Sequence, residues 1–179
     1  MHVKLMILFF CIIAASCTSN GPKAENDSTA AGSDTTLNVA VNPSSQLEVN
    51  PLSGYFLKNT ITVSDSLTFW LIDNQASFDS LFGIAKTMNN TIDRPDFGTH
   101  IVVAATMPPT FYGTQIQLES ATSDNVNNNA TMHFVATANP NRSSASTVPL
   151  WLGAVPKTGK STFQLYTGEH LTKTITTQQ

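Results

Sequence analysis

The stretch Ile101-Val102-Val103-Ala104-Ala105-Thr106-Met107 is the longest apolar run beyond the N-terminal region of this 179-residue chain. It is rich in β-branched residues and is closed by Pro108 and Pro109, which cannot donate to a strand ladder. Such a run is typical of a strand that is buried on both faces. A buried helix is the alternative, but helices this short are marginal and no helical periodicity surrounds the stretch. We therefore expect Ile101–Met107 to be the central strand of the fold.

The segments before this strand predict a hairpin and one helix. Gly54–Val63 and Leu67–Ile72 flank a polar turn and are expected to pair with each other. Asn74 is placed to cap a helix over about residues 75–88. Apolar side chains recur in that helix at spacings of three and four, on one face: Phe78, Leu81, Phe82, Ala85 and Met88. We expect this face to lie against a sheet.

The segments after the central strand predict further strands with short links. Thr114–Ala121 and Thr131–Ala138 alternate between apolar and polar residues and are expected to form a hairpin across an Asn-rich turn. Asn139–Thr147 reads as a polar loop, and Val148–Val155 and Ser161–Thr167 supply the closing strands. This order predicts an α+β fold, mainly antiparallel β-sheet, or a sandwich with one helix packed on it.

The N-terminus predicts export and lipid anchoring. Lys4 is followed by an uncharged apolar run from Leu5 to Ala15, which is too short for a permanent membrane span and is typical of a signal peptide. The run ends in Ala14-Ala15-Ser16-Cys17. This motif resembles the lipobox of bacterial lipoproteins, in which the cysteine receives diacylglycerol and becomes the mature N-terminus. The motif departs from the lipobox at Ala14, where leucine is usual, and a cleaved signal peptide with an incidental Cys17 is the alternative.

The composition changes after the cysteine. Small and polar residues dominate as far as about Gln46, and they bury too little apolar surface to offset the entropy of ordering. We therefore expect residues 1–16 to be a lipoprotein signal peptide, residues 17–48 a flexible tether and residues 49–179 one folded domain. Both cysteines lie in the first 17 residues, so the stability of this domain must come from a hydrophobic core.

The charge balance and the residues next to Cys17 bear on partners and location. The chain has 9 basic and 12 acidic residues, a formal net charge of −3, which gives no counterion-release drive toward nucleic acid. There is no polybasic patch for anionic lipid, so we expect the membrane to be a partner that the protein binds through the acyl chains on Cys17. Thr18-Ser19 lacks the aspartate that retains many lipoproteins at the inner membrane, which favours the outer membrane of a bacterial cell envelope.

A series of short motifs runs through residues 54–166: Gly54-Tyr55-Phe56, Phe69-Trp70-Leu71-Ile72, the helix with Phe78 and Phe82, Pro95-Asp96-Phe97 before Ile101-Val102-Val103-Ala104, Tyr112-Gly113-Thr114-Gln115-Ile116, and Thr147-Val148-Pro149 before Val155-Pro156-Lys157. In this order they resemble the PrcB C-terminal-domain family, small domains of bacterial envelope lipoproteins named after a subunit of a surface protease complex. The resemblance implies a noncatalytic accessory or binding role toward an envelope protein partner such as a protease complex. The chain departs from the family at Phe111-Tyr112-Gly113, where a Gly-Gly-Tyr type turn is more usual.

A second resemblance suggests a different function. Asn50-Pro51-Leu52-Ser53-Gly54-Tyr55 is similar to the Asn-Pro-Thr-Thr-Gly-Tyr loop of chagasin-type inhibitors, which wedge that loop into the cleft of papain-like proteases. The family also uses a Gly-x-Gly-Gly loop, which this chain lacks, and a late Arg-Pro-Trp loop, whereas the Arg-Pro here is Arg94-Pro95. The alternative for Asn50, Pro51, Gly54 and Tyr55 is a turn that leads into the first strand.

The sequence offers no catalytic or metal-binding constellation. There is no Gly-x-Ser-x-Gly nucleophile turn and no paired-histidine spacing for zinc. We therefore expect no catalytic residue, no cofactor and no metal, and we expect His100 and His133 to be structural or surface residues. Aromatic side chains are favoured protein-contact anchors, so Phe111, Tyr112 and Trp151 are candidate interaction residues, with packing in the core or a loop as the alternative.

Overall fold

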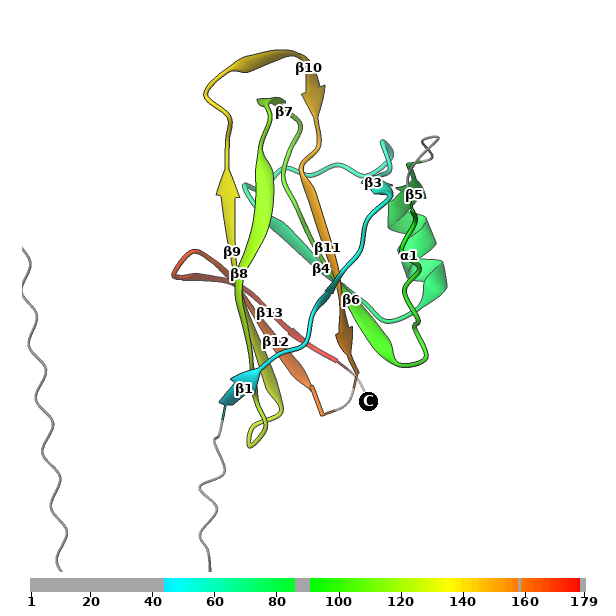
Figure 1. Cartoon of the computed structure of the whole chain (residues 1–179), viewed down its shortest axis with the longest axis vertical. Helices are drawn as coiled ribbons and strands as arrows, with labels where there is room; N and C mark the ends of the chain where they lie inside the picture. The colour runs from blue at the N-terminus through cyan, green and yellow to red at the C-terminus, as the bar shows by residue number, and fades with distance from the viewer. Residues whose placement is uncertain (1–43, 86–90, 158, 178–179) are drawn as a thin grey trace, which may run out of the picture. The chain divides into compact units, whose positions relative to one another are not determined.

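Two β-sheets packed face to face form the described part of the chain, residues 44–85, 91–157 and 159–177 of a computed structural model (Figure 1). One sheet has five strands in the order β1 (Ser44–Gln46), β8 (Gln115–Asp124), β9 (Asn129–Thr137), β12 (Thr162–Thr167) and β13 (His170–Thr176). The other has four, in the order β2 (Asn50–Pro51), β11 (Leu150–Pro156), β6 (His100–Thr106) and β4 (Thr68–Ile72). The predicted signal peptide, Cys17 and the predicted tether as far as residue 43 lie outside the described residues. The last residues assigned to the tether belong to the sandwich instead, because Ser44–Gln46 form β1 and Leu47 is buried in the core.

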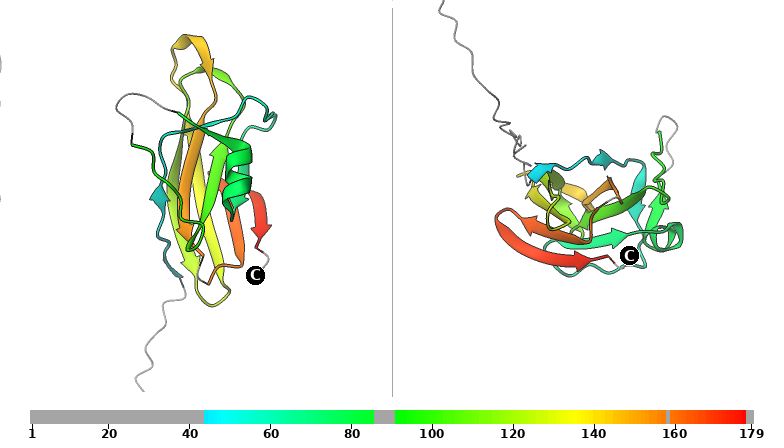
Figure 2. Two further views of the ribbon diagram at one scale, coloured as in Figure 1. Left: turned by 90° about the vertical axis from the view of Figure 1, so that its right-hand side faces the viewer. Right: turned by 90° about the horizontal axis from the view of Figure 1, so that it is seen from below.

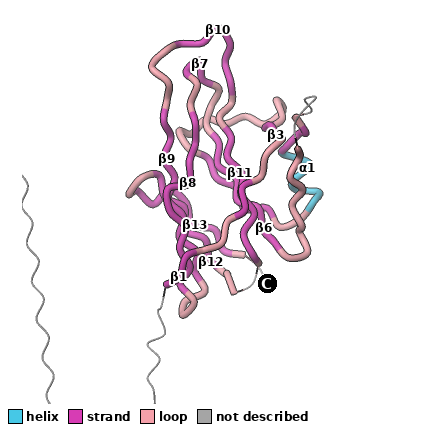
Figure 3. The backbone as a smooth tube through the Cα atoms, in the orientation of Figure 1, coloured by secondary structure: helices cyan, strands magenta, loops and turns pink. Residues whose placement is uncertain are grey.

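Two short ribbons and a helix complete the fold. β3 (Tyr55–Leu57) pairs with β5 (Phe82–Ile84), and β7 (Thr110–Tyr112) pairs with β10 (Arg142–Thr147). The helix α1 (Gln75–Leu81) lies in front of the strands in the left view of Figure 2. Strands dominate the rest of the described backbone (Figure 3). The fold is therefore a mostly antiparallel β-sandwich with one short helix among the described residues, and the α+β description fits it less well.

The predicted central strand is confirmed as β6, which pairs with β11 on one side and β4 on the other. Its side chains alternate between two hydrophobic clusters. Ile101, Val103 and Ala105 point into the interior between the sheets. Val102 and Ala104 point to the opposite face of the four-stranded sheet. Because both faces are covered, the strand needs apolar residues at successive positions, as the sequence indicates.

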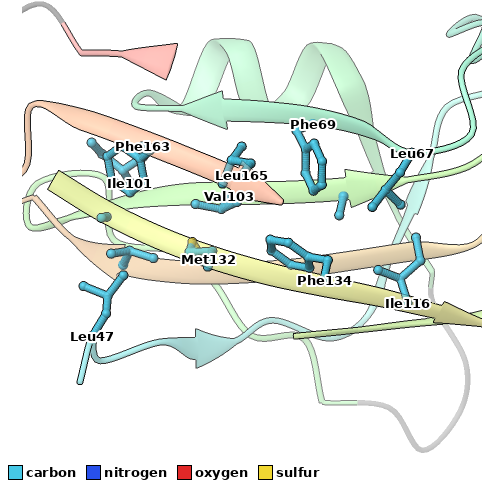
Figure 4. Packing of buried hydrophobic residues seen from close by; sticks show 13 residues of the cluster. Leu47, Leu67, Phe69, Ile101, Val103, Ile116, Met132, Phe134, Phe163 and Leu165 are labelled. Atoms are coloured by element: carbon cyan, nitrogen blue, oxygen red, sulfur yellow. The ribbon is translucent and has the colours of Figure 1, made fainter. Parts of the chain in front are cut away.

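The interior between the sheets is filled by side chains from both layers (Figure 4). Phe134 on β9 has its ring centroid 5.2 Å from that of Phe69 on β4 and 4.9 Å from that of Trp151 on β11. Phe69 and Phe134 are at most 1% exposed. Phe134 therefore contacts aromatic rings from two strands of the opposite sheet.

The second cluster lies between the four-stranded sheet and the layer formed by α1 and the β3–β5 ribbon. Phe78 of α1 is its centre, with ring centroids 5.0 Å from Tyr55, 5.0 Å from Phe82 and 5.7 Å from Phe97. The cap prediction is confirmed, because Asn74 Oδ1 accepts a hydrogen bond from the Ser77 amide at 2.8 Å.

The predicted helix of about residues 75–88 is too long. The helix ends at Leu81, and Phe82 begins strand β5, which pairs with β3. Phe82 remains buried, but it reaches the cluster from a strand. Gly83 is a poor helix former, and a Cβ on it would lie 2.4 Å from Cζ of Phe56, so the ribbon uses its lack of a side chain. Met88 lies outside the described residues.

The predicted hairpin between Gly54–Val63 and Leu67–Ile72 is wrong. β3 pairs with β5, whereas β4 pairs with β6. Both faces of β4 carry apolar residues, which suits a place beside the doubly covered β6. Leu57 at the end of β3 instead packs in the helix-side cluster.

Other expectations for the second half are confirmed only in part. The hairpin of β8 and β9 is confirmed. The polar segment Asn139–Thr147, predicted to be a loop, contains β10, and β13 was not predicted. The closing strands β11 and β12 lie in different sheets and do not pair with each other. β12 pairs in parallel with β9, and the Ser161 amide just before β12 donates to Asn128 O just before β9 at 2.9 Å.

We expect Phe134→Ala to lower the free energy of unfolding by about 3–5 kcal/mol, because the substitution leaves a cavity among rings from both sheets. Urea denaturation measures this. The control is Val126→Ala, in which the wild-type side chain is 68% exposed and the expected change is within about 0.5 kcal/mol. Equal effects of the two substitutions would contradict the assignment of Phe134 to the core.

Candidate functional site

The two sheets are joined at one end of the sandwich by chain segments that pair with each other. β7 carries the chain from β6 to β8, and β10 carries it back from β9 to β11. In the ribbon that they form, Thr110 is opposite Thr147 and Tyr112 is opposite Arg142. We call β7 and β10 the crossover ribbon; it lies at the top of Figure 1.

Hydrogen bonds fasten the base of the crossover ribbon to the four-stranded sheet. The Met107 amide donates to Pro149 O at 3.3 Å, and the buried Thr106 hydroxyl donates to the same oxygen at 2.7 Å. The Tyr112 amide donates to Thr110 Oγ1 at 3.1 Å, and Thr114 Oγ1 donates to Tyr112 O at 3.0 Å. The ribbon is thus held by the ladder of β6 and β11 at one end and that of β8 and β9 at the other.

The crossover ribbon displays two large aromatic side chains. Phe111 is 40% exposed and Tyr112 is 44% exposed. The guanidinium carbon of Arg142 lies 4.2 Å from the centroid of the Phe111 ring, a cation–π arrangement. Both aromatic residues were candidates from the sequence, but Arg142 was not, because it stands in a segment without an alternating pattern. Its importance depends on the pairing of β10 with β7.

Trp151 has a different role from Phe111 and Tyr112. It is half-buried and packs edge-on against Phe134, with an interplanar angle of 74°. It therefore belongs to the packing of the sandwich interior, which was the alternative interpretation of this residue.

The candidate residues Asn50 and Pro51 form the short edge strand β2. Asn50 is opposite Ala154 and Pro51 is opposite Gly153 in β11. The next residue continues the attachment, because the Leu52 amide donates to Leu152 O at 3.0 Å. Both candidate side chains are exposed, but their backbone is part of a sheet.

Gly54 and Tyr55 are held against the segment Thr91–Asp93. Gly54 has a φ of +88°, and a Cβ there would lie 3.2 Å from the Ile92 Cα, so the close approach favours glycine. Tyr55 Oη donates to the backbone oxygen of Asp93 at 2.9 Å, while its ring packs on Phe78. Burial raises the pKa of the Tyr55 phenol.

Ser53 completes this attachment through the Asp93 carboxylate. Asp93 Oδ2 accepts hydrogen bonds from the Ser53 hydroxyl at 2.6 Å and from the Ser53 amide at 3.0 Å. These bonds, the hydroxyl first, lower the pKa of the Asp93 carboxyl below its ordinary value of 3.8. The structure thus places the two predicted groups on different elements: Phe111 and Tyr112 on the crossover ribbon, and Asn50 to Tyr55 along β11 and beside α1.

His133 and His100 make polar contacts with neighbouring residues. His133 Nδ1 lies 3.0 Å from Gly168 O and its ring stacks on Tyr166, and His100 Nδ1 lies 2.7 Å from Thr99 Oγ1.

Within residues 44–85, 91–157 and 159–177, no group of three or more His, Cys, Asp or Glu residues is arranged to hold a metal ion. The same residues contain no helix of the length and apolarity that a membrane crossing requires.

No protein-family model, curated protein or solved structure matches this chain. The resemblance to the PrcB C-terminal-domain family stays a prediction from the order of short motifs. Function therefore has to be inferred from the residues and their geometry.

We expect Asp93→Asn to reduce the sensitivity of the fold to acid. Because the folded pKa of Asp93 lies below the ordinary 3.8, the unfolded chain takes up the proton first. The stability that this carboxylate contributes is present above pH 3.8 and is lost as pH falls through the folded pKa. The melting temperature of the variant should therefore fall less steeply between pH 7 and pH 3 than that of the wild-type protein. The difference should correspond to about one titrating group.

The control for this pH series is Asp65→Asn, which removes one carboxylate from an exposed bend between β3 and β4. Parallel pH profiles for the wild-type protein and Asp93→Asn would contradict the role given to the Ser53–Asp93 hydrogen bonds.

Proposed function

We propose that this protein is a lipid-anchored accessory protein of the bacterial cell envelope and that its sandwich domain binds a protein partner through the crossover ribbon. The observation that carries the proposal is the exposed pair Phe111 and Tyr112 with Arg142 over the Phe111 ring. The role is noncatalytic, and the partner is a protein of an envelope complex such as a protease complex.

The chemistry of the crossover ribbon suits protein recognition. Aromatic residues and arginine are enriched among the residues that dominate binding energy at protein interfaces. The ribbon is already fastened at both ends, so little conformational entropy is lost when a partner packs on it. All six residues of β10 are exposed and uncharged apart from Arg142, which supplies a polar border to the aromatic pair.

The predicted anchor suits a partner in the envelope. A lipid on Cys17 would attach the chain to a membrane, with the outer membrane favoured by Thr18-Ser19. Because β1 begins at Ser44, the tether is at most residues 17–43, and a chain of that length has a mean reach of about 30 Å if it behaves as a flexible coil. The sandwich domain would then sample a layer close to the membrane, where other envelope proteins are concentrated.

The inhibitor function that the Asn50–Tyr55 segment suggests is the weaker candidate. An inhibitory wedge needs a loop that is free to enter a protease cleft. Here Asn50 and Pro51 pair with β11, and Ser53 and Tyr55 bond to Asp93. This geometry favours a packing role for the segment.

The proposal predicts that Phe111→Ser combined with Tyr112→Ser abolishes partner binding without unfolding the sandwich, because both side chains are exposed. The measurement is crosslinking in intact cells, followed by purification through a C-terminal tag. A specific envelope protein should be recovered with the wild-type chain, and its yield should fall at least about ten-fold with the double variant.

The control is Val126→Ser, at a more exposed apolar position in the β8–β9 turn, which should leave recovery unchanged. The Cys17→Ala form tests the anchor separately and should lose the partner through mislocalisation. Equal recovery from the wild-type protein and the double variant would exclude the crossover ribbon as the contact surface.

A further inference from the structure

A pocket of about 400 Å³ lies between the two sheets, next to their edge strands β4 and β13. Ile101, at the start of β6, lines it, whereas the crossover ribbon follows the other end of that strand. Two lysines, Lys157 and Lys160, line it from the segment between β11 and β12. We call this space the lysine pocket.

Lys160 is a nearly buried lysine that forms no salt bridge among the described residues, although the Asp124 carboxylate lies near enough to interact with its charge. Lys160 is 8% exposed, and its Nζ donates to Asn125 Oδ1 at 3.2 Å. That oxygen also accepts a hydrogen bond from the buried Ser123 hydroxyl at 2.7 Å, so Lys160 shares its acceptor. A lysine ammonium carries three donors, and a buried charge is costly unless it is paired.

Lys157 brings a second positive charge to the lysine pocket. Its Nζ donates to Phe97 O at 2.6 Å and to Asp73 O at 3.2 Å, both neutral backbone oxygens. Asp73, just after β4, also lines the pocket. Its Oδ1 accepts a hydrogen bond from Asn74 Nδ2 at 2.7 Å. The lining itself holds two lysines and one aspartate. Two further carboxylates act on these lysines from outside the lining, Asp124 on Lys160 and Asp96 on Lys157.

The remaining walls are apolar on one side and hydroxylated on the other. Leu71, Ile101 and Ile175 line the pocket as members or direct neighbours of the hydrophobic cluster between the sheets. Thr176 and Thr177 contribute the rest of the lining from the end of β13. A pocket with lysines and an apolar wall in its lining has features of a site for an amphipathic small molecule.

We propose that the lysine pocket binds a small amphipathic monoanion, a carboxylate on a short apolar chain. The carboxylate pairs with the Lys160 ammonium and offsets its burial, and the chain packs on Leu71, Ile101 and Ile175. The pocket volume is within the range of small-molecule sites. This binding is independent of the crossover ribbon.

The test titrates hexanoate into the ¹⁵N-labelled full-length protein in a non-ionic detergent and follows the amide resonances. Hexanoate should produce saturable shifts at Ile101, Ile175 and Thr176. The uncharged analogue 1-hexanol should bind at least about ten-fold more weakly, the factor expected for loss of one buried charge pair. Equal affinities for the two compounds, or no saturable shift at these residues, would overturn the proposal.

Variants separate the charge of Lys160 from its structural role. Lys160→Gln keeps a donor for Asn125 but removes the charge, and should weaken hexanoate about ten-fold. Lys160→Arg should restore binding to within about three-fold, because it keeps the charge. Lys58→Gln is the control, since Lys58 Nζ bonds to Asp79 O beside α1, and it should change nothing.

Unchanged hexanoate affinity in Lys160→Gln would assign the binding to another site and overturn the proposal. If Lys160→Gln fails to melt cooperatively, the comparison of hexanoate with 1-hexanol on the wild-type protein decides the question.

Discussion

The double burial of β6 is the constraint on which the rest of the structure depends. Because its successive side chains enter two different hydrophobic clusters, one face of the strand requires the five-stranded sheet and the other requires α1 and the β3–β5 ribbon. Its hydrogen bonds likewise require β4 and β11 as neighbours. Five of its residues, Val102 to Thr106, are fully buried, and at about 25 cal/mol per Å² of apolar surface such a strand contributes heavily to folding.

A sandwich built this way leaves the backbone of its edge strands exposed, and lysines satisfy part of it. Lys173 on β13 donates to Phe69 O on β4 at 2.8 Å, which links the edges of the two sheets. Lys157, which follows β11, donates to Asp73 O just after the edge strand β4 and to Phe97 O in the loop before β6. Lysine on edge strands also discourages pairing with other chains. Lys160 differs from these two, because its acceptor is a shared side-chain amide in a nearly buried position, and this difference supports a ligand at the lysine pocket.

The sequence predicts the parts of the fold that local pattern determines. The apolar run of β6, the Asn74 cap and the alternation of β8 and β9 all survive in the structure, because each is encoded within a few residues. The pairing of β3 with β5, the parallel pairing of β9 with β12 and the crossover ribbon depend on contacts between distant segments, which periodicity does not reveal. For the same reason Phe111 and Tyr112 are visible as candidates from the sequence, whereas Arg142 becomes one through its place opposite Tyr112.

The measurement that most directly tests the central place of β6 is native-state hydrogen exchange as a function of urea. The account predicts that the amides of Val102, Val103 and Ala104 exchange through global unfolding, with an opening free energy within about 0.5 kcal/mol of the free energy of unfolding. The amides of the exposed β10 should exchange through smaller local openings. Exchange of the β6 amides at a lower free energy than those of β12 or β10 would contradict the account.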